Sequence, residues 1–293
     1  MPPDKPKVTG PLGPRRAIAN AVRKLREDSG KLLNEVAHDL MMSTSKLSRL
    51  ENAQGKPLPR DIRDLIRYYE IEGTPLARSL ERWVKAAQQP GWWTSYDDEV
   101  IEGLDAHLAY EVDAAVARVY TIPFLPVHLQ TLDYARAIYR DMEHRSESQI
   151  RQLLAVRLRR QDALRNREGL EPLRLIAVTY ESSLHQMVGS PDIMREQLDE
   201  LVERSTNDPN VTLRVLPFTA KPVFSMTCMY ALFEYKDVGE SDVVHIETHA
   251  GFFSVEDGDQ IKKYGTHHEA LMRASLTEEE SRNRIISIRD ALR

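Results

Sequence analysis

The stretch Glu35–Asn52, which reads EVAHDLMMSTSKLSRLEN, decides the fold of the first quarter of the chain. Its apolar residues recur at helical spacing on both sides of a short polar break, and this pattern predicts two helices. Ser43 suits the N-cap of the second helix, because its hydroxyl can accept a hydrogen bond from a free N–H of the first turn. We expect one helix to end near Leu40 and the next to span residues 44–52.

The turn between these helices is about three residues long, which is typical of a helix-turn-helix. The outward positions of the second helix carry hydroxyls and cations and no acidic residue before Glu51. Such a face suits a DNA groove lined by phosphates and base edges. Arg49 and Glu51 have an alternative role, that of tying the helix to its neighbours, so Ser45 is the better candidate for reading bases. The candidate DNA-binding residues are Ser43, Thr44, Ser45, Lys46, Ser48, Arg49 and Lys56.

The charge balance differs between the first 70 residues and the rest. Of 40 Lys and Arg, 14 lie in residues 1–70, against 9 of the 45 Asp and Glu, so the remainder is acidic. A basic segment ahead of an acidic one suggests that the basic part faces a polyanion such as double-stranded DNA. The excess is modest, and a chance fluctuation would look the same.

At about 150 residues per domain, a chain of 293 residues suggests two domains. We predict a multi-domain protein, in which an all-α helix-turn-helix domain precedes an α+β regulatory domain of helices and a small mixed sheet. The predicted boundaries are a disordered tail over 1–13, the DNA-binding domain over 14–88, a junction over 89–98 and the regulatory or partner-binding domain over 99–293.

Helical and strand patterns alternate in the second part. Strands rich in β-branched and aromatic residues are predicted over Leu173–Tyr180, Val211–Phe218, Cys228–Tyr235 and Val243–Thr248. Helices are predicted over residues 100–119, 129–142, 147–167, 191–205, 257–275 and 277–292.

Several classes of protein are disfavoured. No apolar run approaches the ~20 residues that span a bilayer, and the N-terminus has no apolar segment of a secretion signal. The single cysteine, Cys228, leaves no internal disulfide and no cysteine-based zinc site, so a reduced cytoplasm is the simplest setting. Phosphate-loop and hydrolase motifs are lacking, and we expect neither an enzyme nor a cofactor.

His245, Glu247 and His249 would place three metal-capable side chains on one face of a strand. The same spacing is ordinary for half-buried strand residues, and a His-x-Glu deaminase also needs a Pro-Cys-x-x-Cys segment. We therefore expect no functional metal.

A second polar group combines the helix over 147–167 with the ends of strands. A buried Arg–Glu set would join helices to the sheet, since buried charges need partners. The alternative is a polar pocket for a small effector or for the tail of a partner. The residues concerned are Arg157, Arg160, Gln161, Glu181 and Glu247.

The segment from Ser43 to Glu51, followed by Pro57 and Pro59, resembles the Xre or lambda-repressor-type helix-turn-helix family. Later motifs follow in a specific order. They are Gly91-Trp92-Trp93, Leu129-Gln130-Thr131, Arg157-x-x-Arg160-Gln161, Glu181-x-x-Leu184 and Val215-Leu216-Pro217-Phe218. Together they resemble the actinobacterial Xre-type regulators with a C-terminal domain of unknown function, the WhiJ-like or antitoxin-like regulators. This resemblance implies transcriptional control and a small partner protein encoded nearby.

The chain departs from that family at several places. Met41 stands where the turn usually has Gly, and Leu32-Leu33 replace the usual hydroxyl cap and Gln at the start of the first helix of the motif. The phosphate contact of those positions therefore cannot be carried over. The segment Ile122–His128 and His245 also differ from the common pattern.

These observations favour a sequence-specific DNA-binding transcription regulator, a homodimer whose C-terminal domain senses the small partner. Two alternatives stay open. One is an antitoxin-like protein that neutralises its partner and regulates its own synthesis through DNA binding. The other is a small-molecule-responsive repressor.

Overall fold

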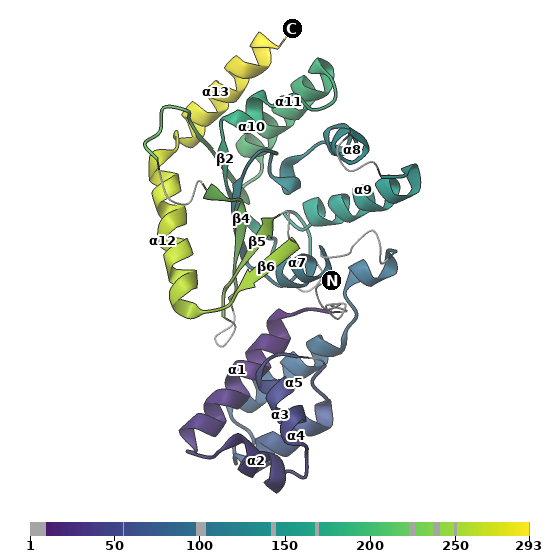
Figure 1. The fold of residues 1–293 in the computed structure, drawn as a ribbon, viewed down its shortest axis with the longest axis vertical. Coiled ribbons are helices and arrows are strands. Elements are labelled where there is room, and N and C mark those ends of the chain that lie inside the picture. Colours follow the sequence, from purple (N-terminus) through teal and green to yellow (C-terminus); the bar gives the residue numbers. More distant parts are fainter. Residues whose placement is uncertain are drawn as a thin grey trace. The chain divides into compact units, whose positions relative to one another are not determined.

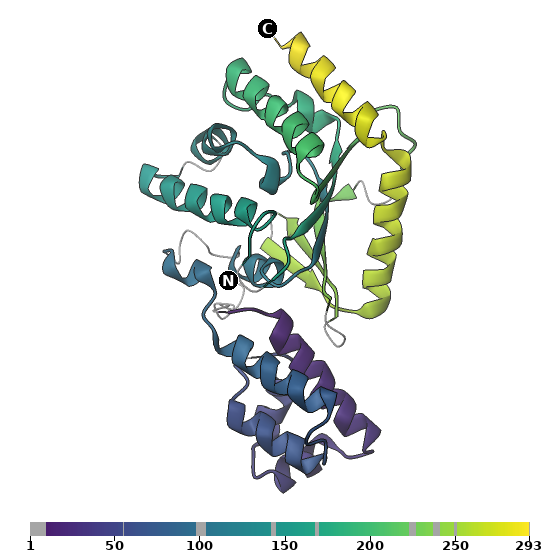
Figure 2. The same cartoon turned by 180° about the vertical axis from the view of Figure 1, so that it is seen from behind.

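The computed structural model describes residues 10–54, 56–97, 104–141, 145–167, 170–222, 227–236, 241–248 and 251–292. Within these ranges the chain forms two compact units (Figures 1 and 2). The helical unit comprises the residues up to Ser95 together with Asp105–Asp113 and Tyr235–Ser241. The sheet unit comprises Tyr96–Leu104, Ala114–Glu234 and Asp242–Arg293.

The helical unit is built on short amphipathic helices. They are α1 (Gly13–Asp28), α2 (Leu33–Asp39), α3 (Thr44–Glu51), α4 (Pro59–Tyr68), α5 (Pro75–Gln88), the 3-10 turn η1 (Trp92–Ser95) and most of α7 (Leu104–Glu111). Helices α4 and α5 begin with a proline, which suits a first turn whose N–H groups have no partner within the helix. The apolar faces of α1 to α5 share one core, which includes Ile18, Val22, Val36, Leu47, Ile62, Leu65 and Leu80.

The sheet unit contains a mixed sheet, which is six-stranded over the described residues, in the order β3-β2-β1-β4-β5-β6. The strands are β1 (Val116–Thr121), β2 (Arg174–Tyr180), β3 (Val211–Leu216), β4 (Tyr230–Glu234), β5 (Val243–Thr248) and β6 (Gly251–Val255). β1, β2 and β3 are parallel, whereas β4, β5 and β6 pair antiparallel. The predicted α+β class with a mixed sheet is confirmed.

Helices flank this sheet on both sides. They are η2 (Val127–Leu129), α8 (Leu132–Asp141), α9 (Glu147–Asp162), α10 (Ser182–His185), α11 (Pro191–Asn207), α12 (Gly258–Ala274) and α13 (Glu278–Ala291). In Figures 1 and 2, α12 lies on one side of the sheet, and α8, α9 and α11 lie on the other. Under α12 the apolar core includes Tyr120, Val178, Leu216 and Tyr230.

One predicted helix is wrong over part of its length. Residues 100–119 were expected to be helical, but α7 ends at Glu111 and Val116–Thr121 forms β1, an inner strand of the sheet. The alanines of this segment favour a helix locally. Pairing with β2 and β4 overrides that preference, because it satisfies the strand's backbone on both sides. β6 was not expected either.

Each helix in the described ranges is too short or too polar to cross a bilayer.

Candidate nucleic-acid interface

The helix α3 starts where the sequence predicts. Ser43 has an extended backbone, and its Oγ accepts a hydrogen bond from the backbone N–H of Lys46 at 3.2 Å. The preceding turn is closed by a hydrogen bond from Met42 N to Ala37 O at 2.9 Å. Leu47 is fully buried and holds the inner face of α3 on the core. The opposite face is thereby turned to solvent.

The C-terminal end of α3 is fixed on α1 by an ion pair. The Glu51 side chain is only 4% exposed, and its two oxygens accept hydrogen bonds from Arg26 Nε at 2.8 Å and Arg26 Nη2 at 2.9 Å. These bonds raise the pKa of the Arg26 guanidinium. Arg23 adds hydrogen bonds to Glu51 O at 2.6 Å and Asn52 Oδ1 at 2.8 Å. Charged, bidentate contacts of this kind hold a helix in one orientation.

The solvent face of α3 carries the predicted hydroxyls. Thr44 and Ser45 are exposed, and Ser48 is half-buried. The Oγ atoms of Ser43 and Ser45 lie 3.3 Å apart. Arg49 is exposed, and within the described part of the chain its guanidinium has no hydrogen bond or ion pair. Lys56 is also exposed, beyond the end of the helix.

Lys46 is placed differently from Arg49. Its Nζ lies 2.7 Å from Asp61 Oδ1 on α4, in an ion pair whose Lys46 side chain is 40% exposed and whose Asp61 side chain is 11% exposed. The sequence predicts that Lys46 contacts DNA and that Arg49 is shared between DNA and scaffold. In the structure Glu51 supplies the tie to α1, and the cation of α3 that is held by a neighbouring helix is Lys46, through Asp61. Asp61 and Arg26 were missed, since neither lies in the motif.

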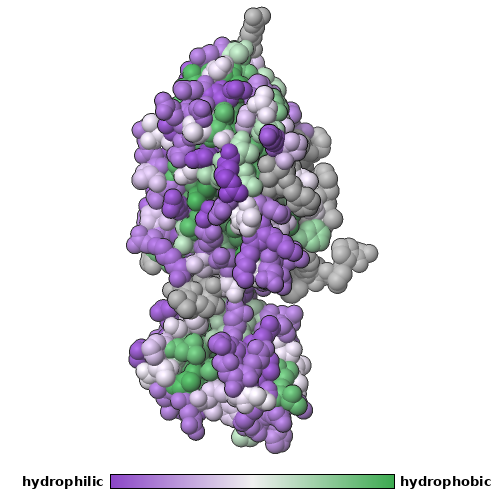
Figure 3. Space-filling view, turned by 90° about the vertical axis from the view of Figure 1, so that its left-hand side faces the viewer, coloured by the Kyte–Doolittle hydropathy of each residue, from purple (hydrophilic) through white to green (hydrophobic). Residues whose placement is uncertain are grey.

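The N-cap and the first residue of α2 have apolar side chains, Leu32 and Leu33. Leu32 occupies the N-cap position and is 62% exposed, and its backbone N–H donates to Glu35 Oε2 at 2.7 Å. Met41, in the turn, is 95% exposed and has a φ of 51°, in the left-handed region. Both departures from the family pattern therefore leave apolar side chains in solvent. Figure 3 shows apolar patches, in green, within a mostly hydrophilic surface.

The polar group predicted in the sheet unit is not a single cluster. Arg157 is buried, donates to Gln130 Oε1 and to the Tyr139 hydroxyl, and lies 5.1 Å from the centroid of the Tyr139 ring. Gln161 donates to Gln130 O at 2.6 Å. These contacts fix η2 and the following residues against α9, so they are structural. Arg160 is buried on the same helix.

Glu181 has other partners than those expected. It is 3% exposed, accepts a hydrogen bond from Phe218 N at 2.7 Å, and pairs with Arg284 Nη1 on α13 at 2.5 Å. Glu247 is exposed on β5. The expected Arg–Glu set is therefore wrong. The Arg157 side chain is held by neutral groups, whereas Glu181 is neutralised by an arginine that lies 103 positions later.

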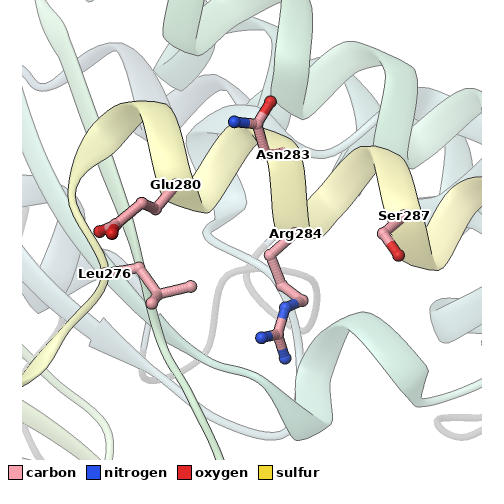
Figure 4. A pocket seen from close by; sticks show the side chains of 5 residues that line it. All are labelled: Leu276, Glu280, Asn283, Arg284 and Ser287. Atoms are coloured by element: carbon pink, nitrogen blue, oxygen red, sulfur yellow. The ribbon is translucent and has the colours of Figure 1, made fainter.

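Arg284 also borders an open pocket along α13. Its lining residues are Leu276, Glu280, Asn283, Arg284 and Ser287, and its volume is about 370 Å³. In Figure 4 the Arg284 side chain extends away from α13, between those of Glu280 and Ser287. The Glu280 carboxylate accepts hydrogen bonds from Thr277 N and Oγ1, and this lowers its pKa. The pocket thus combines a guanidinium, a carboxylate, an amide and a hydroxyl.

The histidine strand face does not assemble a metal site from the described residues. His245 is buried, its Nδ1 lies 3.3 Å from Ser254 Oγ, and its ring stacks on Phe252. Glu247 is exposed, and His249 lies outside the described residues. Nowhere in the described ranges do three His, Cys, Asp or Glu side chains group in a way that suits a metal ion.

Comparison with protein-family models agrees with this arrangement. Residues 17–78 match a family described as a helix-turn-helix domain, so the class of protein is a DNA-binding regulator of the helix-turn-helix type. Residues 104–287, more than half of the chain, match the family described as Domain of unknown function (DUF5753). The chain therefore belongs to the DUF5753 family. No curated protein and no solved structure matches it.

Proposed function

We propose that this protein is a sequence-specific transcription regulator that inserts α3 into the major groove of double-stranded DNA. The observation that carries the proposal is the solvent face of α3, where Thr44, Ser45 and Arg49, which has no ion pair to a described residue, project from a helix fixed by Arg26 and Glu51. A rigid helix is needed, because base edges are read by side chains held in register with the groove.

The chemistry of this face suits direct readout. An arginine can donate two parallel hydrogen bonds to guanine O6 and N7, and hydroxyls can donate to or accept from several base edges. The N-terminus of α3 adds a partial positive charge and free N–H groups, which favour a nearby phosphate. In this proposal Arg49 and Ser45 read bases, while Ser43, Thr44, Ser48 and Lys56 supply the surrounding contacts.

The test is footprinting across the genome with the full chain, followed by binding measurements on the recovered sites. Arg49→Ala is expected to weaken operator binding by about 1–3 kcal/mol and to relax the base preference at one position. Lys24→Ala, which removes one positive charge from the exposed Lys24 of α1, is the matched control. Equal affinities of the wild type and Arg49→Ala at fixed salt would contradict the proposal.

We further propose that two copies bind together and that the sheet unit provides the dimer contact. Paired helix-turn-helix domains read half-sites ~34 Å apart, one turn of the duplex, and so recognise a palindromic site. Light scattering of the DNA complex checks this, and a monomer bound to its operator would exclude it.

The sheet unit is proposed to sense a signal rather than to catalyse a reaction. By the resemblance to WhiJ-like regulators, the signal is a small protein encoded nearby, and co-purification with the neighbouring gene's product tests this. The pocket at Arg284 favours a second candidate, a small-molecule-responsive regulator. A compound that shifts both the melting temperature and the operator affinity would support that candidate over the protein partner and over an antitoxin role.

A further inference from the structure

The two cations on α3 differ in one respect that bears on DNA affinity. Arg49 has no charged partner in the described ranges, whereas Lys46 is paired with Asp61 at 2.7 Å. Asp61 lies in the first turn of α4, where the partial positive charge of a helix N-terminus favours a carboxylate. Its side chain is mostly buried, and Lys46 is its one ion-pair partner within 4 Å among the described residues. A buried carboxylate favours a cation beside it, so Asp61 holds Lys46 in the free protein.

A paired lysine contributes less to binding a polyanion than a free one. Counterion release scales with the number of phosphates that protein cations neutralise. If Lys46 turns to a phosphate, it must leave Asp61. If it stays, the Asp61 carboxylate comes close to the DNA backbone and repels it. In either case the gain is smaller than for an unpaired lysine.

We propose that Asp61 attenuates DNA binding by withholding Lys46 from the phosphate backbone. The inference rests on the proposed DNA-binding function. A phosphate contact is made without regard to base sequence, so its loss lowers operator affinity and non-specific affinity by about the same factor. Asp61 thereby lowers the affinity for any duplex and the salt dependence of binding, while discrimination between sequences is left to base contacts such as those proposed for Ser45 and Arg49.

The experiment measures the affinity of the full chain for a random-sequence duplex and for a recovered operator over a range of salt concentrations. Asp61→Asn keeps the shape of the side chain and removes its charge. We expect it to raise affinity for the random duplex several-fold at low salt. The slope of log affinity against log salt should become steeper by roughly 0.9, the value for one additional phosphate contact. Operator affinity should rise by a similar factor, because a phosphate contact does not depend on base sequence.

Two controls identify the cause. Asp64→Asn removes a charge from the same helix, where Asp64 pairs with Arg60 at 3.7 Å, and should leave the slope unchanged. In a Lys46→Met background, Asp61→Asn should no longer steepen the slope, because the lysine that it frees is absent. Thermal melting of each variant checks that it is folded.

An unchanged slope in folded Asp61→Asn overturns the inference, and so does an equal effect of Asp64→Asn or an effect that persists without Lys46. The proposed function fails in a different way, namely if the wild-type chain binds neither duplex.

Discussion

The carboxylate of Glu51 accepts two hydrogen bonds from the guanidinium of Arg26, at 2.8 and 2.9 Å, and so joins the end of α3 to α1. This contact decides how the proposed recognition helix is held. Because Glu51 is almost fully buried, its charge cannot be solvated if Arg26 is lost.

Removal of the Arg26–Glu51 ion pair should lower the stability of the helical unit and, as a consequence, its affinity for DNA. Arg26→Met leaves the Glu51 carboxylate buried without its guanidinium, and we expect a loss of about 2–3 kcal/mol in the free energy of unfolding of the helical unit. Chemical denaturation monitored by circular dichroism measures it. The double variant Arg26→Met/Glu51→Leu should recover part of the loss, since it leaves no unpaired charge. No recovery would argue against the ion pair as the cause.

The turn of the motif is strained at Met41. A side chain at a φ of 51° is disfavoured, whereas glycine adopts such a φ readily. Met41→Gly should therefore stabilise the helical unit by about 0.5–1 kcal/mol, the strain relieved less the extra entropy of the unfolded glycine. Met41 is 95% exposed, so little packing is lost. The melting temperature of the unit is the readout.

Gly30 provides the converse of this prediction. It has a φ of 68°, and a Cβ added there would meet no atom within 4 Å. Gly30→Ala should thus destabilise through backbone strain alone, by about 1 kcal/mol. If Gly30→Ala were neutral and Met41→Gly had no effect, backbone strain would not govern these two turns.

His268 should make the sheet unit sensitive to acid. It is a fully buried residue of α12, with Nδ1 3.1 Å from the Tyr230 hydroxyl, and burial together with the nearby Arg118 lowers its pKa from 6.5 to about 4. The unfolded chain then binds the proton more readily than the folded chain. Stability is present above pH 6.5 and falls as the pH drops toward 4, by about 3 kcal/mol over that range.

A variant whose side chain at position 268 cannot be protonated separates the contribution of His268 to the pH dependence of stability from the contributions of the carboxyl groups. We expect the advantage of wild type over His268→Asn in urea denaturation to shrink between pH 7 and pH 4.5, whereas His267→Asn should follow the wild type. Parallel curves for wild type and His268→Asn would contradict the prediction.

Arg284 should matter more for stability than other surface arginines of α13. Its loss leaves the buried carboxylate of Glu181 with the Phe218 N–H at 2.7 Å and the more distant His185 Nε2 at 3.9 Å, and we expect Arg284→Ala to cost about 1–3 kcal/mol. Arg289→Ala is the control, because Arg289 pairs with the exposed Asp199 and Asp290 and should leave stability unchanged. Equal effects of the two variants would show that the burial of Glu181 is unimportant.

The fold was predicted best where local signals suffice. Val243–Thr248 was predicted as a strand with the observed bounds, and α3 begins after Ser43 as expected, because a cap and a short periodic run are properties of neighbouring residues. The prediction failed at β1. The segment around Ala114 and Ala117 has no glycine or proline to end a helix, and only pairing with β2 and β4 makes it a strand.

Some features of the candidate interface could likewise be predicted from the sequence, whereas others depend on tertiary packing. The sequence by itself determined the helix-turn-helix, the cap at Ser43 and the hydroxyls of α3, because these depend on spacings of a few residues. The tertiary structure alone decided which cation is free. Asp61 and Arg26 approach α3 only when α1 and α4 pack on it, and the charge that a side chain offers to DNA depends on the partner beside it in space.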